Sequence, residues 1–114
     1  MENLNSWKYF PIELPSELKE NAILLYETLG VHDIAWECKD VLQVIEYLYS
    51  NSVVILGGDV ILKKLEGYEF VGDNWHEDSG SVLKSYQLSK QFIKEYFRKR
   101  GDSYVYTLIC KERD

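Results

Sequence analysis

The sequence predicts one α+β domain over residues 1–114, with an antiparallel sheet of about four strands packed by about three helices. A chain of 114 residues has the usual length of one domain. Its apolar segments follow the order helix, helix, strand, strand, strand, helix, strand. Because three consecutive strands are joined by short turns, an antiparallel meander is expected.

Two helices are expected in the first half of the chain. After Pro15, Ser16 is a good N-cap and Gly30 a good C-terminal stop, which predicts a helix over 16–29. Segment 31–37 is expected to link it to a second helix over 38–51. The apolar face of that second helix is formed by Val41, Val44, Ile45 and Leu48, although its β-branched residues would also suit a strand.

A double glycine separates the next two apolar runs, 52–56 and 59–65. A two-residue Gly-Gly connection is a preferred β-hairpin turn, because both central positions need a positive φ. We therefore expect Gly57 and Gly58 to form a turn between two strands. Asp59 is expected to cap that turn through its carboxylate.

The remaining elements are a strand, a long helix and a final strand. Residues 68–75 continue the sheet, and the helix is expected over 81–100, closed by Gly101. Its apolar stripe is expected at Val82, Tyr86, Ile93, Tyr96 and Phe97. The last strand, within 103–112, is apolar on both faces, which indicates a central position in the sheet.

The sequence "GGD" could also hold a phosphate or a metal. A phosphate loop needs its glycines to open a helix, whereas here they precede an apolar, β-branched run. A metal ligand at Asp59 would need partners, and His32 and His76 stand alone. We therefore expect no metal and no cofactor. A small enzyme or metal-binding domain that uses Asp59, His76 and nearby carboxylates remains the alternative.

An acidic, aromatic segment follows the second strand, from Glu66 to Asp78. It contains no Lys or Arg, and its acids would suit either a solvated strand edge or a surface that attracts a basic partner. Tryptophan is a typical interface anchor. The candidate partner-binding residues are Glu66, Glu69, Asp73, Trp75, Glu77 and Asp78.

The charge balance separates possible partners. Nineteen acidic residues against 13 basic residues give a net charge of −6, which disfavours nucleic acid and favours a basic protein. The first residues lack the pattern of a signal peptide, and no run approaches the roughly 18 apolar residues of a membrane span. The cytoplasm is the simplest location. Nothing in the sequence specifies an oligomeric state.

The stretch from Val53 to Trp75 resembles a known family. Its strand, "GGDV", second strand, short turn and "DNW" are similar to the immunity protein 40 family of bacterial polymorphic toxin systems. Gly57, Gly58 and Asp59 match the family's Gly-Gly-Asp, and Trp75 matches a downstream tryptophan. The resemblance implies an α+β protein that binds and neutralises a cognate toxin, a nuclease domain being one candidate, without catalysis. A structural adaptor would look the same from sequence.

Overall fold

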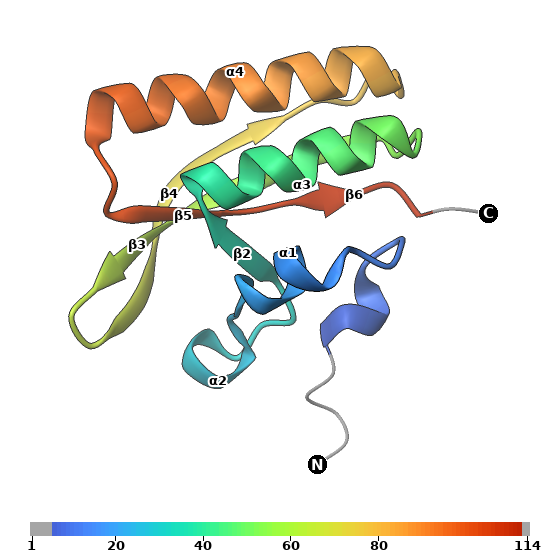
Figure 1. The fold of residues 1–114 in the computed structure, drawn as a ribbon. Coiled ribbons are helices and arrows are strands. Elements are labelled where there is room, and N and C mark those ends of the chain that lie inside the picture. The colour runs from blue at the N-terminus through green and yellow to red at the C-terminus, as the bar shows by residue number, and fades with distance from the viewer. Residues whose placement is uncertain (1–5, 113–114) are drawn as a thin grey trace.

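The protein is a six-stranded antiparallel sheet with two long helices on one face (Figure 1). The computed structural model describes residues 6–112. In that range the strands are β1 (Ile23–Leu24), β2 (Ile34–Glu37), β3 (Ile55–Lys64), β4 (Gly67–His76), β5 (Tyr104–Thr107) and β6 (Ile109–Cys110). The helices are a 3-10 helix (Ser6–Tyr9), α1 (Ser16–Glu20), α2 (Tyr26–Leu29), α3 (Cys38–Ser50) and α4 (Val82–Arg100). The predicted α+β class is confirmed, with more strands than expected.

The strand order is β1-β2-β5-β3-β4, and β6 pairs with β3. β5 is therefore an inner strand, as its two apolar faces predicted. Tyr106 pairs with Trp36 of β2 on one side and with Val60 of β3 on the other. The predicted single strand over 103–112 is interrupted at Leu108, so that its end forms β6.

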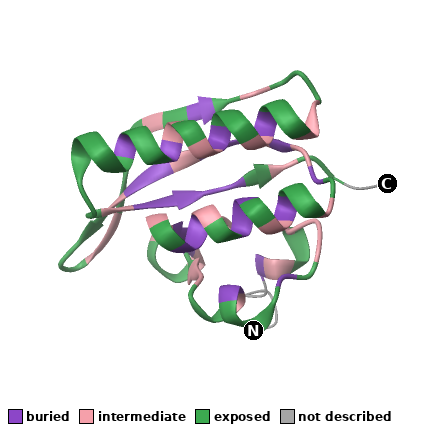
Figure 2. Ribbon diagram, turned by 45° about the horizontal axis from the view of Figure 1, so that its top comes forward, coloured by how far each residue is buried: buried purple, intermediate pink, exposed green. Residues whose placement is uncertain are grey.

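The main core lies between the sheet and the helices α3 and α4 (Figure 2). α3 fulfils its prediction, because the four apolar residues expected to face the core are fully buried. They pack with Trp36 and Tyr106, two of the largest fully buried side chains. Burial of such side chains is the main source of stability in a domain of this size.

α4 begins where the sequence predicts, since Ser81 Oγ accepts a hydrogen bond from the Lys84 amide at 3.0 Å. Its buried face differs from the predicted stripe. Only Ile93 and Tyr96 of that stripe are buried, and Phe97 is exposed. The rest of the buried face is made of small residues, Ser85 and Ser89. Their hydroxyls accept hydrogen bonds from the sheet, so α4 lies close to it.

The predicted helix over 16–29 is wrong, because the structure breaks it into α1, β1 and α2. β1 is an edge strand, in which Ile23 pairs with Ala35 of β2. This pairing also turns the predicted linker 31–37 largely into β2. Gly30 does close α2, with φ of +74°. Sheet pairing and burial of Leu25 outweigh the local helical spacing.

The predicted hairpin turn at Gly57 and Gly58 is also wrong. β3 runs without a break from Ile55 to Lys64 and includes both glycines and Asp59. The hairpin to β4 turns instead after Lys64, which pairs with Gly67. The glycines are required because the backbone of neighbouring strands packs closely against β3 at these two positions.

The second face of the sheet carries a smaller apolar cluster. Leu25, Ala35, Ile61 and Val105 are fully buried there, with residues of the α2 region packed against them. α2 follows the edge strand β1 and brings this cover to the sheet. In the described part of the chain, no helix is both long and apolar enough to cross a membrane.

Candidate functional site

The glycine pair in β3 provides room for neighbouring backbone. A Cβ added at Gly57 would lie 2.2 Å from the carbonyl oxygen of Trp75, and one at Gly58 would lie 2.1 Å from that of Thr107. The same Cβ at Gly58 would meet the indole of Trp75 at 2.5 Å. Real Cβ atoms do not approach backbone so closely, so only glycine fits at both positions.

Trp75 uses the space that these glycines leave. Its side chain is 6% exposed, its ring stacks on Phe92 of α4 at 4.9 Å, and its indole N–H donates to Ser89 Oγ at 2.9 Å. Gly58 pairs directly with Trp75 across β3 and β4. Trp75 is therefore part of the core that joins β4 to α4, and its aromatic surface is not presented to solvent.

Asp73 is held by the same helix. The hydroxyl of Tyr96 donates to its carboxylate at 2.7 Å, and the guanidinium of Arg100 lies 5.3 Å from the Tyr96 ring. Burial, and next the hydrogen bond to Asp73, raise the pKa of Tyr96 to about 12. Tyr96 therefore stays a neutral donor that fixes Asp73 against α4.

The start of β4 and the turn before it are exposed to solvent. Leu65 is 100% exposed at the turn, and Phe70 and Val71 on β4 are also exposed. Glu66 beside Leu65 is exposed, and Glu69 contacts Lys64 at 3.1 Å with both side chains about half in solvent. Such an exposed ion pair contributes little to stability, because water screens it. We call residues 64–71 the hairpin surface.

The acids that follow β4 lie in a loop before α4. Glu77 accepts hydrogen bonds from the hydroxyl and amide of Ser79, which lower its pKa. His76 and Asp78 are exposed and lie 3.8 Å apart. The predicted site residues thus lie on β4, in the turn before it and in the loop after it. Trp75 and Asp73 face α4, whereas Glu66 and Glu69 lie at or beside the turn.

Asp59 lies on β3, opposite Asn74 of β4, and its amide donates to Thr107 Oγ1 at 2.9 Å. Burial raises the pKa of its carboxyl group. Asp33 shows the same direction, because burial and the nearby negative charge of Asp59 both raise its pKa. His76 pairs with Gly57, two register positions further along the same pair of strands. Within residues 6–112, no three His, Cys, Asp or Glu side chains gather as metal ligands would.

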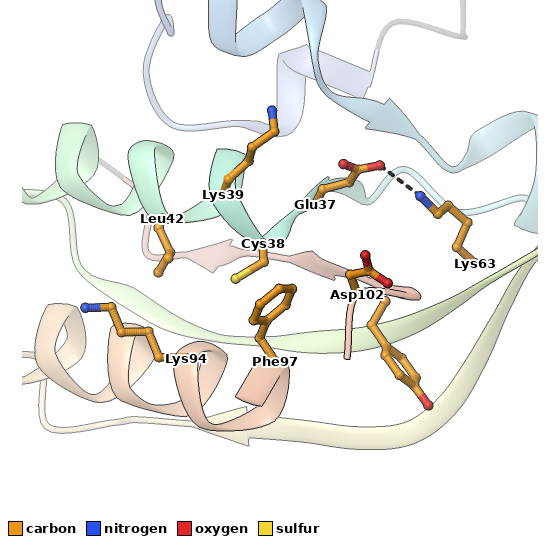
Figure 3. A pocket seen from close by; sticks show the side chains of 9 residues that line it. Glu37, Cys38, Lys39, Leu42, Lys63, Lys94, Phe97 and Asp102 are labelled. Atoms are coloured by element: carbon orange, nitrogen blue, oxygen red, sulfur yellow. Dashed lines mark hydrogen bonds and ion pairs between the residues drawn. The ribbon is translucent and has the colours of Figure 1, made fainter. Parts of the chain in front are cut away.

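A cavity of about 490 Å³ lies where the start of α3 faces the second half of α4 (Figure 3). Cys38, Leu42 and Phe97 form apolar walls. Lys63 donates to Glu37 at 2.9 Å at one end, so these charges are already paired. Sequence reasoning did not find this cavity, since its walls come from separate elements. Phe97, which was predicted to face the core, is exposed and lines this cavity instead.

The fold and these surfaces define a small α+β protein with a β-hairpin at one edge of its sheet, on which apolar and charged side chains are exposed. A family model described as Immunity protein 40 matches residues 25–110. This match spans α2 to β6 and includes "GGD" and the acidic segment, so the chain belongs to the Immunity protein 40 family. The resemblance found in the sequence is thereby confirmed. Neither the curated proteins nor the solved structures contain a significant match.

Proposed function

We propose that this immunity protein neutralises a cognate toxin domain by binding it through the acidic hairpin surface. The observation that carries the proposal is the position of Leu65, which is fully exposed at a turn beside the acids Glu66 and Glu69. Leu65, Phe70 and Val71 are exposed together on this hairpin, and a group of exposed apolar side chains bordered by charges is typical of protein interfaces. Family membership supplies the class of partner, a toxin.

The charge of the chain supports a basic partner. The net charge of −6 gives a long-range attraction to a basic protein, and the local acids direct that partner to the hairpin. A nuclease domain fits this description, because its substrate channel must attract phosphate. The acids would then occupy the channel in place of nucleic acid. The chain itself is proposed to bind no nucleic acid and no membrane, to use no cofactor and to catalyse no reaction.

The six predicted contact residues have different roles in this proposal. Glu66 and Glu69 lie on the hairpin surface and form the contact, whereas Asp73, Glu77 and Asp78 lie toward the other end of β4 and add to the negative charge that attracts the partner. Trp75 supports the contact indirectly, since it fixes β4 to α4 and is too buried to touch a partner. The complex is proposed to form in the cytoplasm, where an incoming toxin would meet its target.

The test is protection from toxin in living cells. Candidate toxin domains encoded near the gene of this chain are expressed alone and together with it, and cell survival is measured. We expect one domain that kills alone and is harmless beside the wild-type chain. The double variant Glu66→Lys with Glu69→Lys should lose protection, because both changes place positive charge on the hairpin surface.

The matched control is the double variant Glu17→Lys with Glu20→Lys, which makes the same charge change on the exposed surface of α1. We expect this control to protect like the wild type. Equal protection by both double variants would show that the hairpin surface is not the contact. If no domain is neutralised, yet the chain forms a stable complex with a housekeeping protein, the chain is an adaptor and the proposal is wrong.

A further inference from the structure

We propose that the toxin adds a strand to the outer edge of β4, so that a basic, extended segment of the toxin continues the sheet. This inference rests on the proposed function, and it specifies how the partner is recognised. It begins from the two edges of the sheet. β1 is only 2 residues long, whereas β4 has 10 residues and, within residues 6–112, pairs with β3 alone. A long open edge is a template for another strand.

The hydrogen bonds of β3 show which amides of β4 point outward. The amides of Asp59 and Lys63 both donate toward β5 or the loop before it, to Thr107 Oγ1 and to the carbonyl oxygen of Ser103. An amide that points toward β5 cannot also bond to β4. In an antiparallel pair, the residue opposite such an amide likewise directs its own N–H away from the partner strand.

The register then identifies the outward amides. Asn74 lies opposite Asp59, and Tyr68 lies opposite Lys63. Because outward amides alternate along a strand, His76, two residues after Asn74, and Phe70, two residues after Tyr68, also direct their amides outward. The hydrogen bond from the Glu77 amide to the carbonyl of Leu56 agrees, because Glu77 then points inward and His76 outward.

A bulge divides this edge into two runs. Between the pairs Asp59–Asn74 and Ile61–Phe70, three residues of β4 lie opposite the single residue Val60. Gly72, with φ of +88°, lies in the bulge. Bulges interrupt continuous edge pairing, which protects against indiscriminate association. The run nearest the turn, Gly67–Phe70, remains open and is the one we assign to the toxin.

Side chains around this run specify the occupant. Phe70 is 43% exposed, and with Leu65 it supplies apolar contact on either side of Glu66 and Glu69, of which Glu69 is paired with Lys64. A second copy of the chain paired along this run would bring its own glutamates against them, and like charges on neighbouring strands repel. Lysine or arginine alternating with apolar residues on a toxin strand would complement both features.

Amide hydrogen exchange tests the inference directly. The probe is the toxin domain that the protection assay identifies, mixed with the full chain. We expect the amides of Tyr68 and Phe70 to exchange at least 10-fold more slowly in the complex. Unchanged exchange at both amides, in a complex that forms, would overturn the added strand while leaving the proposed function intact. If no toxin domain binds, both the inference and the function fail.

A pair of variants gives a second readout. Phe70→Pro removes an outward N–H while leaving the inward pairing with β3, a position at which edge strands tolerate proline. Phe70→Ala removes the side chain but keeps the N–H and is the control. We expect the proline variant to bind the toxin at least 10-fold more weakly than the alanine variant. Equal affinities would overturn the inference, as would slowed exchange of these amides by self-association without toxin.

Discussion

The two ends of β4 are one strand in two environments. Near its end, Trp75 is 6% exposed and packs against Gly58 and Ser89. Near its start, Phe70 is 43% exposed and Leu65 before it is entirely in solvent. The difference shows that packing against α4 fixes one end of the strand, whereas the side chains at its other end are available for contact with a partner. Changes at the packed end should therefore affect stability, and changes at the exposed end should affect binding.

Trp75→Ala should have the largest effect. It removes a buried indole and its hydrogen bond to Ser89, and replacing a buried Trp by Ala costs about 3–5 kcal/mol. Chemical denaturation measures the free energy of unfolding. Phe70→Ala, at the exposed end, should lower the free energy of unfolding by about 0.5 kcal/mol or less, as for most exposed positions. Similar losses for both variants would contradict the division of β4.

Gly58→Ala should follow, with a loss of about 3 kcal/mol, since overpacking of this kind typically costs 1–3 kcal/mol or more. The new Cβ would meet the carbonyl of Thr107, which cannot move without disturbing β5. The control is Gly72→Ala in the bulge, where a Cβ has open space and only the positive φ of +88° is unfavourable. That strain costs about 1–2 kcal/mol. Thermal unfolding of both variants compares crowding with backbone strain.

Ser89→Ala should have a smaller effect. It leaves the indole N–H of Trp75 buried without an acceptor, which costs about 1–3 kcal/mol. Ser89→Thr keeps the hydroxyl and separates loss of the hydrogen bond from a change in volume. The near-UV circular dichroism spectrum, to which Trp75 contributes, should change together with the unfolding free energy in the alanine variant. An unchanged free energy in Ser89→Ala would show that the hydrogen bond does not anchor β4.

Asp33→Asn should have the smallest effect, about 0.5 kcal/mol or less, within the usual range for partly exposed sites. Because burial raises the pKa of Asp33, ionisation disfavours the folded state, so its stabilising contribution is present at acid pH and is lost as pH rises through the folded pKa. The asparagine variant should thus melt higher than wild type at pH 7 but not near pH 3. Exposed Asp102→Asn is the control, and a gain that persists at acid pH would contradict this account.

Local patterns predicted the elements whose signals agree with their packing. α3 and α4 have periodic apolar residues and, in α4, an N-cap serine, so both were found with boundaries close to those observed. The two apolar faces of β5 predict its central position, which the strand order confirms. These features depend on neighbours within a few residues.

Other features depend on contacts that sequence does not show. "GGD" has the local chemistry of a turn, but residues about 17 and 49 positions away, Trp75 and Thr107, require the glycines inside a strand. β1 exists only because β2 is available to pair with it. At the candidate site, the acidic segment was recognised from composition, whereas burial of Trp75 and exposure of Leu65 follow from tertiary packing.

The most direct test of the proposed contact is the rate at which the toxin domain associates with the chain, measured by stopped-flow fluorescence at low and high salt. The account predicts that Glu66→Lys with Glu69→Lys slows association at least 10-fold at low salt, because the two reversals remove attraction to a basic partner. The difference from wild type should shrink at high salt, where charges are screened. Association rates and salt dependence equal to those of the wild type would contradict the central claim.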